Sequence, residues 1–226
     1  MGIVLLQYEG KFVAQVPLLN FRTFASEKVE DLVEVSEAGT RRYKFYTYSG
    51  SFATFETSFK RWATWLTHRD LRAFKMDGPD NPTNLIAALG NCKFNEDDDY
   101  QDAMIDAWVS WLKDGKPIGD LNVERLQRTN FFYTSWTGRL VELKCALILH
   151  HDAKAVSMKD SENLSSPYSI AVCQRVRDLA LISFAQPDRK PTDPLQMSDD
   201  QFCEAYHSHS QHDQPCYKTK SLPEQL

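Results

Sequence analysis

The chain has 226 residues, of which 42% are hydrophobic and 25% are charged, and its formal net charge at pH 7 is -5. This composition is typical of a globular protein with a buried core, so disorder over most of the chain is excluded. The negative charge excludes a general affinity for nucleic-acid backbones or anionic membranes, because both would repel the average surface. The sequence carries no pattern of a secretory signal and no apolar run long enough to span a bilayer.

Two strands are predicted at the start of the chain, over residues 3–8 and 11–16, joined by Glu9-Gly10 in the manner of a tight hairpin turn. The next segment, 17–35, opens with a proline and carries apolar residues at helical spacing, which predicts one bent helix or two short ones. A third strand is expected over residues 43–48, where aromatic and polar residues alternate.

Helical patterns fill most of the remaining chain. The acidic residues Glu96 to Asp99 charge-complement the start of a helix that ends at Gly115, and their spacing does not match a calcium-binding EF-hand loop. Further helices are expected near 83–90, 121–128, 138–151 and 167–184. The most strongly amphipathic helix covers residues 51–68, and its apolar face is formed by Phe52, Phe55, Phe59, Trp62 and Leu66. The order of elements predicts an α+β protein with a small sheet beside a helical cluster.

Four stretches, taken in chain order, resemble fungal BTB/POZ domain proteins. VLLQYEGKFVAQVPLL is similar to the opening of a BTB domain, in which two strands run into a helix with paired leucines. FATFETSFKRWATWLTH and LIAALGNCKFNEDDDYQDAMIDAWVSWL resemble the helices that follow, and LNVERLQRTNFFYTSWTGRLVELKCALILHHDA resembles the fungal extension. The tail residues that match the ending of many such proteins are Cys203, Tyr206, His207, His209 and Cys216.

The resemblance implies a BTB/POZ-like domain over residues 1–116, with a three-stranded sheet packed on helices, and a helical extension over 117–186 packed on that domain. Three prolines within 187–194 predict a linker, so residues 187–226 are expected to form a proline-containing linker and a Cys/His-rich tail. The chain departs from the family at Val16-Pro17, where a histidine is usual, and at Thr67, where a tyrosine is usual.

Motifs of catalysis are missing from the sequence. None of the nine glycines belongs to a nucleophile elbow, a phosphate-binding loop or a dinucleotide-binding loop, so we predict that the protein is not an enzyme. His150 and His151 end a predicted helix, and His68 ends another, where histidines interact favourably with the terminal carbonyls. No cofactor is expected, with zinc as the one alternative.

The cysteines indicate a reducing compartment. They are odd in number and widely spaced, which is typical of free thiols in the cytoplasm or the nucleus. Three of them, Cys92, Cys145 and Cys173, fall within apolar helical patterns, where they are expected to be inert core residues.

The tail offers a candidate metal site. Cys203, His207, His209, His212 and Cys216 lie within fourteen residues, and zinc is held by four such ligands. A helical start would place Cys203 and His207 on one face, and a turn at residues 208–210 would be needed to close the site. Because the spacing matches no common zinc motif, the sequence favours a loosely ordered or locally docked tail over a zinc site.

Two functions from different classes remain open. The resemblance implies a non-catalytic protein–protein interaction module that self-associates as a homodimer and acts as an adaptor or regulatory scaffold, with protein partners that include cullin-type ubiquitin ligases. The alternative is a zinc-binding regulatory factor that works through Cys203, His207, His209 and Cys216. For the first function, we expect an interface of apolar residues that one small sheet and helix cannot all bury, namely Leu5, Tyr8, Phe12, Leu18, Leu19 and Phe21.

Overall fold

The computed structural model describes residues 2–8, 10–25, 30, 32–34, 40–45, 52–70, 97–115, 135–151, 167–211 and 213–222. The helices predicted near 83–90 and 121–128 lie outside this part of the chain. The chain divides into two compact units, the first formed by Met1–Met104 with Pro215–Leu226 and the second by Ile105–Gln214. The boundaries that we predict at residues 116 and 186 remain a prediction.

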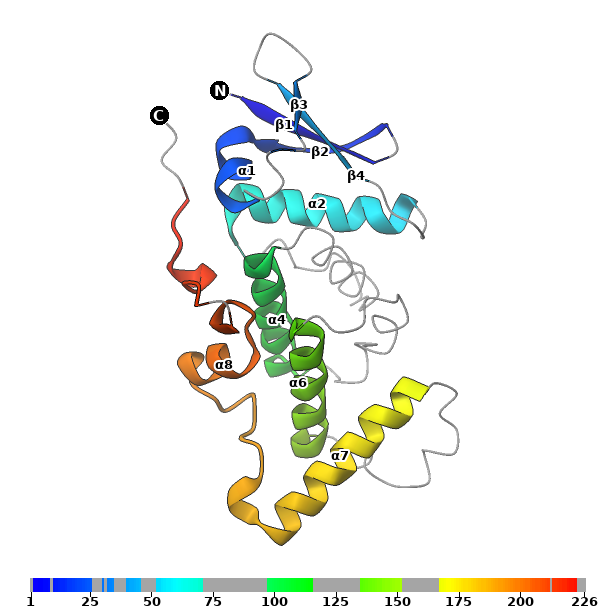
Figure 1. The fold of residues 1–226 in the computed structure, drawn as a ribbon, viewed down its shortest axis with the longest axis vertical. Coiled ribbons are helices and arrows are strands. Elements are labelled where there is room, and N and C mark those ends of the chain that lie inside the picture. Colours follow the sequence, from blue (N-terminus) through cyan, green and yellow to red (C-terminus); the bar gives the residue numbers. More distant parts are fainter. Residues whose placement is uncertain are drawn as a thin grey trace. The chain divides into compact units, whose positions relative to one another are not determined.

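The first unit contains a mixed sheet with the strand order β2-β1-β4-β3 (Figure 1). β1 (Ile3–Tyr8) pairs antiparallel with β2 (Lys11–Pro17) and parallel with β4 (Arg41–Phe45). The three predicted strands are therefore present, and the α+β class is confirmed. A fourth strand, β3 (Val33–Glu34), occupies a position where the sequence predicts helix, because Val33 pairs with Arg42 of β4 at the edge of the sheet.

The β1–β2 hairpin contains two local adjustments. Gly10 has a φ of +79°, a left-handed conformation that glycine adopts without steric cost in a two-residue turn. The register shifts after Leu6, so that Val13 is the extra residue of a β-bulge. In a regular strand, side chains three positions apart point to opposite faces of the sheet. The bulge shifts this alternation by one residue, which explains why Val13 and Val16 are both buried.

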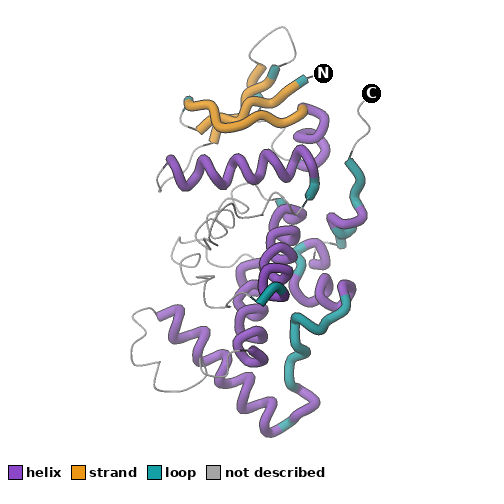
Figure 2. The backbone as a smooth tube through the Cα atoms, turned by 180° about the vertical axis from the view of Figure 1, so that it is seen from behind, coloured by secondary structure: helices purple, strands orange, loops and turns teal. Residues whose placement is uncertain are grey.

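α1 (Leu18–Phe24) and α2 (Phe52–His68) complete the core of this unit, and α2 runs along one face of the sheet in both ribbon and tube views (Figures 1 and 2). The aromatic rings of Phe21, Tyr43 and Trp62 meet between them, with centroids 5.4 to 6.5 Å apart. Asn20 of α1 donates hydrogen bonds of 2.9 and 3.2 Å to the last carbonyls of α2, which satisfies groups that a helix end leaves open. The predicted apolar face of α2 is confirmed for the members whose side chains are described, Phe59, Trp62 and Leu66.

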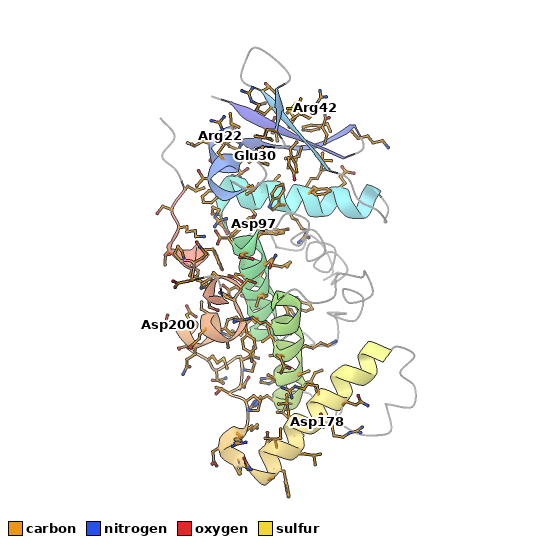
Figure 3. The ribbon with its side chains drawn as sticks, in the orientation of Figure 1. Arg22, Glu30, Arg42, Asp97, Asp178 and Asp200 are labelled. Atoms are coloured by element: carbon orange, nitrogen blue, oxygen red, sulfur yellow. The ribbon has the colours of Figure 1, made fainter. Side chains whose placement is uncertain are left out.

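α4 (Asp98–Lys113) begins with the predicted acidic cap. Asp97, labelled at the start of this helix in Figure 3, accepts a 2.9 Å hydrogen bond from the backbone N–H of Tyr100. Asp99 in the first turn forms ion pairs with Arg69, at the end of α2, and with Lys220 near the C-terminus. Ala103, Met104, Trp108 and Leu112 of this helix are buried.

In the second unit, α6 (Ser135–His151) packs against α7 (Pro167–Ala185). Cys145 of α6 and Val176 of α7 are fully buried where the two helices meet, so the prediction that Cys145 is a core residue is confirmed. Glu142 and Arg175 form an ion pair of 3.0 Å across the same helix pair. Among the described residues, no helix combines the length and apolar character needed to cross a bilayer.

The two histidines lie in the last turn of α6, as predicted. Their rings also contact the segment that follows η5 (Pro187–Arg189). His150 Nε2 lies 2.8 Å from the carbonyl oxygen of Pro191, and His151 Nε2 lies 2.8 Å from the carboxylate of Asp193. The predicted linker is therefore attached to α6 by side-chain contacts.

Candidate metal centre

The chain after the proline-containing segment forms a helix, α8 (Asp199–Tyr206), shown in Figure 1. Ser198 and Gln201 form a capping box, in which the Ser198 hydroxyl accepts from the Gln201 N–H at 3.3 Å and the Gln201 side chain accepts from the Ser198 N–H at 3.1 Å. Phe202 and Tyr206 are buried. This part of the tail is thus folded, which agrees with a locally docked tail and differs from a loosely ordered one, the two forms that the sequence favours over a zinc site.

The backbone after α8 turns the chain back on itself. The N–H of His207 donates to the carbonyl of Cys203 at 3.0 Å, so these two residues lie one helical turn apart. His207 itself is extended, and a short 3-10 helix, η6 (His209–Gln211), follows. A hydrogen bond of 3.1 Å from the N–H of Gln214 to the carbonyl of His209 then closes the loop. The turn that the sequence requires at residues 208–210 is confirmed.

This local path brings together the four residues predicted as metal ligands. One donor atom from each of Cys203, His207, His209 and Cys216 lies within 4.8 Å of all the others. Bonds of about 2.0 to 2.3 Å to a tetrahedral zinc ion would place neighbouring donor atoms about 3.3 to 3.8 Å apart. Side-chain adjustments of about 1 Å therefore separate this arrangement from a zinc site. The fifth sequence candidate, His212, lies outside the described residues.

The four candidate ligands differ in their exposure to solvent. His207 and His209 are buried, with exposed fractions of 0% and 6%, whereas the two cysteines are half-buried. The ring centroids of His207 and His209 lie 5.3 Å apart. The ring of Phe202 packs edge-on against His207, with a centroid distance of 5.6 Å. The Phe202 ring excludes water from His207, and the half-buried cysteines leave a metal ion access to the cluster.

Two side chains from outside the tail fix His207. Asp106 of α4 places a carboxylate oxygen 3.0 Å from His207 Nε2. Arg139 of α6 donates to the carbonyl oxygens of His207 and Glu204 at 2.7 and 2.9 Å, and also to the hydroxyl of Ser210 at 3.0 Å. Neither residue was predicted from the sequence, because no spacing rule connects positions so far apart in the chain.

The donor atoms of the four side chains indicate which metal ion fits the cluster. Two thiolates and two imidazoles in a tetrahedral arrangement are the donor set that zinc prefers, while calcium and magnesium require oxygen ligands. Because the protein supplies all four ligands, no coordination position is left for a reacting water. The set therefore fits a structural zinc ion and does not fit a hydrolytic one.

The predicted interface residues fall into different environments. Phe12 on β2 and Leu19 on α1 are exposed, with fractions of 58% and 44%. Leu5 and Leu18 are half-buried, and Phe21 is fully buried, because it packs between Tyr43 and Trp62. Phe21 is thus a core residue of the first unit. The side chain of Tyr8 lies outside the described part of the structure.

Comparisons with protein-family models, with curated proteins and with solved structures found no match for this chain.

Proposed function

We propose that this protein is a zinc-stabilised, non-catalytic protein. In this proposal, Cys203, His207, His209 and Cys216 bind one structural zinc ion that fixes the fold of the C-terminal segment. The observation that carries the proposal is the convergence of all four donor atoms within 4.8 Å in a segment of fourteen residues. Apolar content in this segment is low, and metal ligation commonly supplies the folding free energy that a small core does not.

The experiment is elemental analysis of the full-length protein, purified without added metal and without a histidine tag. Near-stoichiometric zinc is expected, together with its loss in a variant that carries both Cys203→Ser and Cys216→Ser. Cys145→Ala is the matched control, because this thiol lies in the α6–α7 core and has no place in the cluster. Zinc content below one tenth of the protein concentration, after refolding with zinc as well, would refute the proposal.

A second candidate function, protein–protein interaction, is favoured by exposed apolar side chains. Leu181, Ile182 and Phe184 lie within four residues of the end of α7 and have exposed fractions of 62%, 41% and 91%. Phe12 and Leu19 are exposed in the first unit as well. Large apolar side chains grouped on a surface are typical of interaction sites.

For this candidate we keep the BTB/POZ-like architecture as a proposal. The succession of hairpin, short helix, returning strand and long amphipathic helix supports it. A homodimer formed through the N-terminal segment and an adaptor role toward cullin-type ligases follow from the same resemblance. Reduced thiols and a thiolate-bound zinc ion suit the reducing cytoplasm or nucleus. Binding of purified cullin in a titration with the zinc-loaded protein tests the adaptor role directly.

A further inference from the structure

The side chain of His207 is contacted by a carboxylate that comes from a different helix. Asp106 lies on α4, 101 positions earlier in the chain, and its Oδ1 is 3.0 Å from Nε2 of His207. Asp106 is mostly shielded, with 11% of its side chain exposed, and the His207 side chain is fully buried. A carboxylate–imidazole contact in such surroundings is stronger than the same contact in water.

This contact determines which ring nitrogen can bind a metal ion. With Asp106 ionised, its carboxylate only accepts hydrogen bonds, so Nε2 of His207 would carry the proton and donate it to Asp106. The lone pair of the neutral ring is then on Nδ1, which is also buried. In metal sites, a histidine ligand characteristically donates its second N–H to a carboxylate, which fixes the tautomer and raises the basicity of the ligating nitrogen.

We infer that Asp106 is a positioning residue for the metal centre, which holds His207 as an Nδ1 ligand and tightens zinc binding through the imidazole ring. The inference rests on the proposed zinc site. It adds a residue of α4 to that site and specifies the ligating atom. Arg139 supports the same residue from the backbone side, because it binds the His207 carbonyl at 2.7 Å. His207 is thus fixed at its ring and at its carbonyl before a metal ion arrives.

The first test measures zinc affinity of the full-length protein by competition with a chromophoric chelator. Asp106→Ala is expected to weaken zinc binding about 10- to 100-fold. Asp106→Asn keeps the size of the side chain and an oxygen that accepts from Nε2, so its loss is expected to be smaller. Asp114→Asn is the matched control, because it removes the same charge from an exposed position beyond the end of α4 and is expected to keep wild-type affinity.

The second test identifies the ligating nitrogen, which a merely structural role for Asp106 would not determine. Long-range proton–nitrogen correlation spectra of the zinc-loaded protein are expected to show His207 protonated at Nε2 and metal-bound at Nδ1. Ligation through Nε2, or wild-type zinc affinity in both Asp106 variants, would overturn the inference while the zinc site itself stood. A wild-type protein that binds no zinc would overturn the proposed function, and the inference with it.

Discussion

The indole Nε1 of Trp62 donates a hydrogen bond of 3.0 Å to the carboxylate of Asp97 in the interior of the first unit. The same carboxylate accepts from the backbone N–H of Tyr100 at the start of α4. Asp97 is 5% exposed, and burial raises the pKa of its carboxyl from 3.8 to about 6, although the bonds from Trp62 and Tyr100 oppose that rise. The folded protein therefore holds the neutral form of Asp97 more readily than the unfolded chain does.

The raised pKa makes the free energy of unfolding depend on pH. Between pH 4 and pH 6 the unfolded chain loses the Asp97 proton while the folded protein keeps it. The stabilising contribution of protonated Asp97 is therefore complete below about pH 4 and is lost as the pH rises through 6. We expect the loss to be about 3 kcal/mol. Denaturant unfolding at a series of pH values, compared between the wild type and Asp97→Asn, measures it.

The asparagine variant keeps an oxygen for the N–H of Tyr100 and loses the titration, so the difference between the two curves isolates Asp97. Asp98→Asn, one residue later in the first turn of α4, is the control and is expected to follow the wild type. Parallel curves for the wild type and Asp97→Asn over this range would show that the Asp97 carboxyl titrates normally.

A second prediction concerns the residues that attach the C-terminus to the first unit. The ring of Tyr217 is 7% exposed and packs edge-on against Trp65 at 5.4 Å, while Lys220 Nζ forms an ion pair of 2.7 Å with Asp99. Tyr217→Ala is expected to lower the free energy of unfolding by about 2 to 4 kcal/mol, because it leaves a cavity against Trp65. Lys220→Met is expected to cost less, because Asp99 keeps its ion pair with Arg69. Equal losses in thermal unfolding would contradict this order.

A third prediction concerns protease access to the segment that follows α7. His150 and His151 bind Pro191 and Asp193, so we expect trypsin to cleave after Arg189 slowly in the native protein. Loss of these two hydrogen bonds, each contributing about 1 kcal/mol, would raise the fraction of molecules in which the segment has detached from α6 by about tenfold or more. A variant with both histidines changed to alanine should be cleaved faster by that factor, and His68→Ala should not. Unchanged cleavage would mean that these contacts do not hold the segment closed.

The elements that the sequence predicts well are those decided by local periodicity. The β1–β2 hairpin and the apolar face of α2 depend on spacing within one element, and the structure contains both. Val33 was expected to be helical, yet it forms a strand, because its pairing with Arg42 depends on a neighbour that periodicity does not reveal. α8 was predictable in principle, since Ser198 and Gln201 have the spacing of a capping box.

The candidate site could be predicted only in part. The residue types and the fourteen-residue interval identify the four ligands, and the turn after His207 follows from the need to bring them together. Their surroundings could not be predicted, because Asp106 and Arg139 belong to helices that precede His207 by 101 and 68 positions. Such contacts depend on the packing of helices, which no local pattern encodes.

A fourth prediction concerns removal of the metal. Zinc at about a thousand times its dissociation constant should add about 4 kcal/mol to the free energy of opening the C-terminal segment, and a strong chelator should remove that increment. The local effect should be greatest between Ser198 and Cys216, where hydrogen exchange of backbone amides is expected to accelerate after chelation. The α6–α7 pair around Cys145 serves as the internal control and should exchange at an unchanged rate. Uniform acceleration throughout the chain would contradict a local role of the ion.

The last prediction concerns self-association through Phe12 and Leu19, the exposed members of the predicted interface. Phe12 lies on β2, an edge of the described sheet, and edge strands expose backbone groups that can pair with another chain. Light scattering after size exclusion should give the wild type twice the mass of one chain. Glutamate at both positions should give the mass of a single chain, because burying two charges at an interface costs several kcal/mol. Phe184→Glu, which introduces the same charge at an apolar residue of α7 that is 91% exposed, should leave the dimer intact. Dissociation by Phe184→Glu alone would place the interface on α7, and a monomeric wild type would refute self-association.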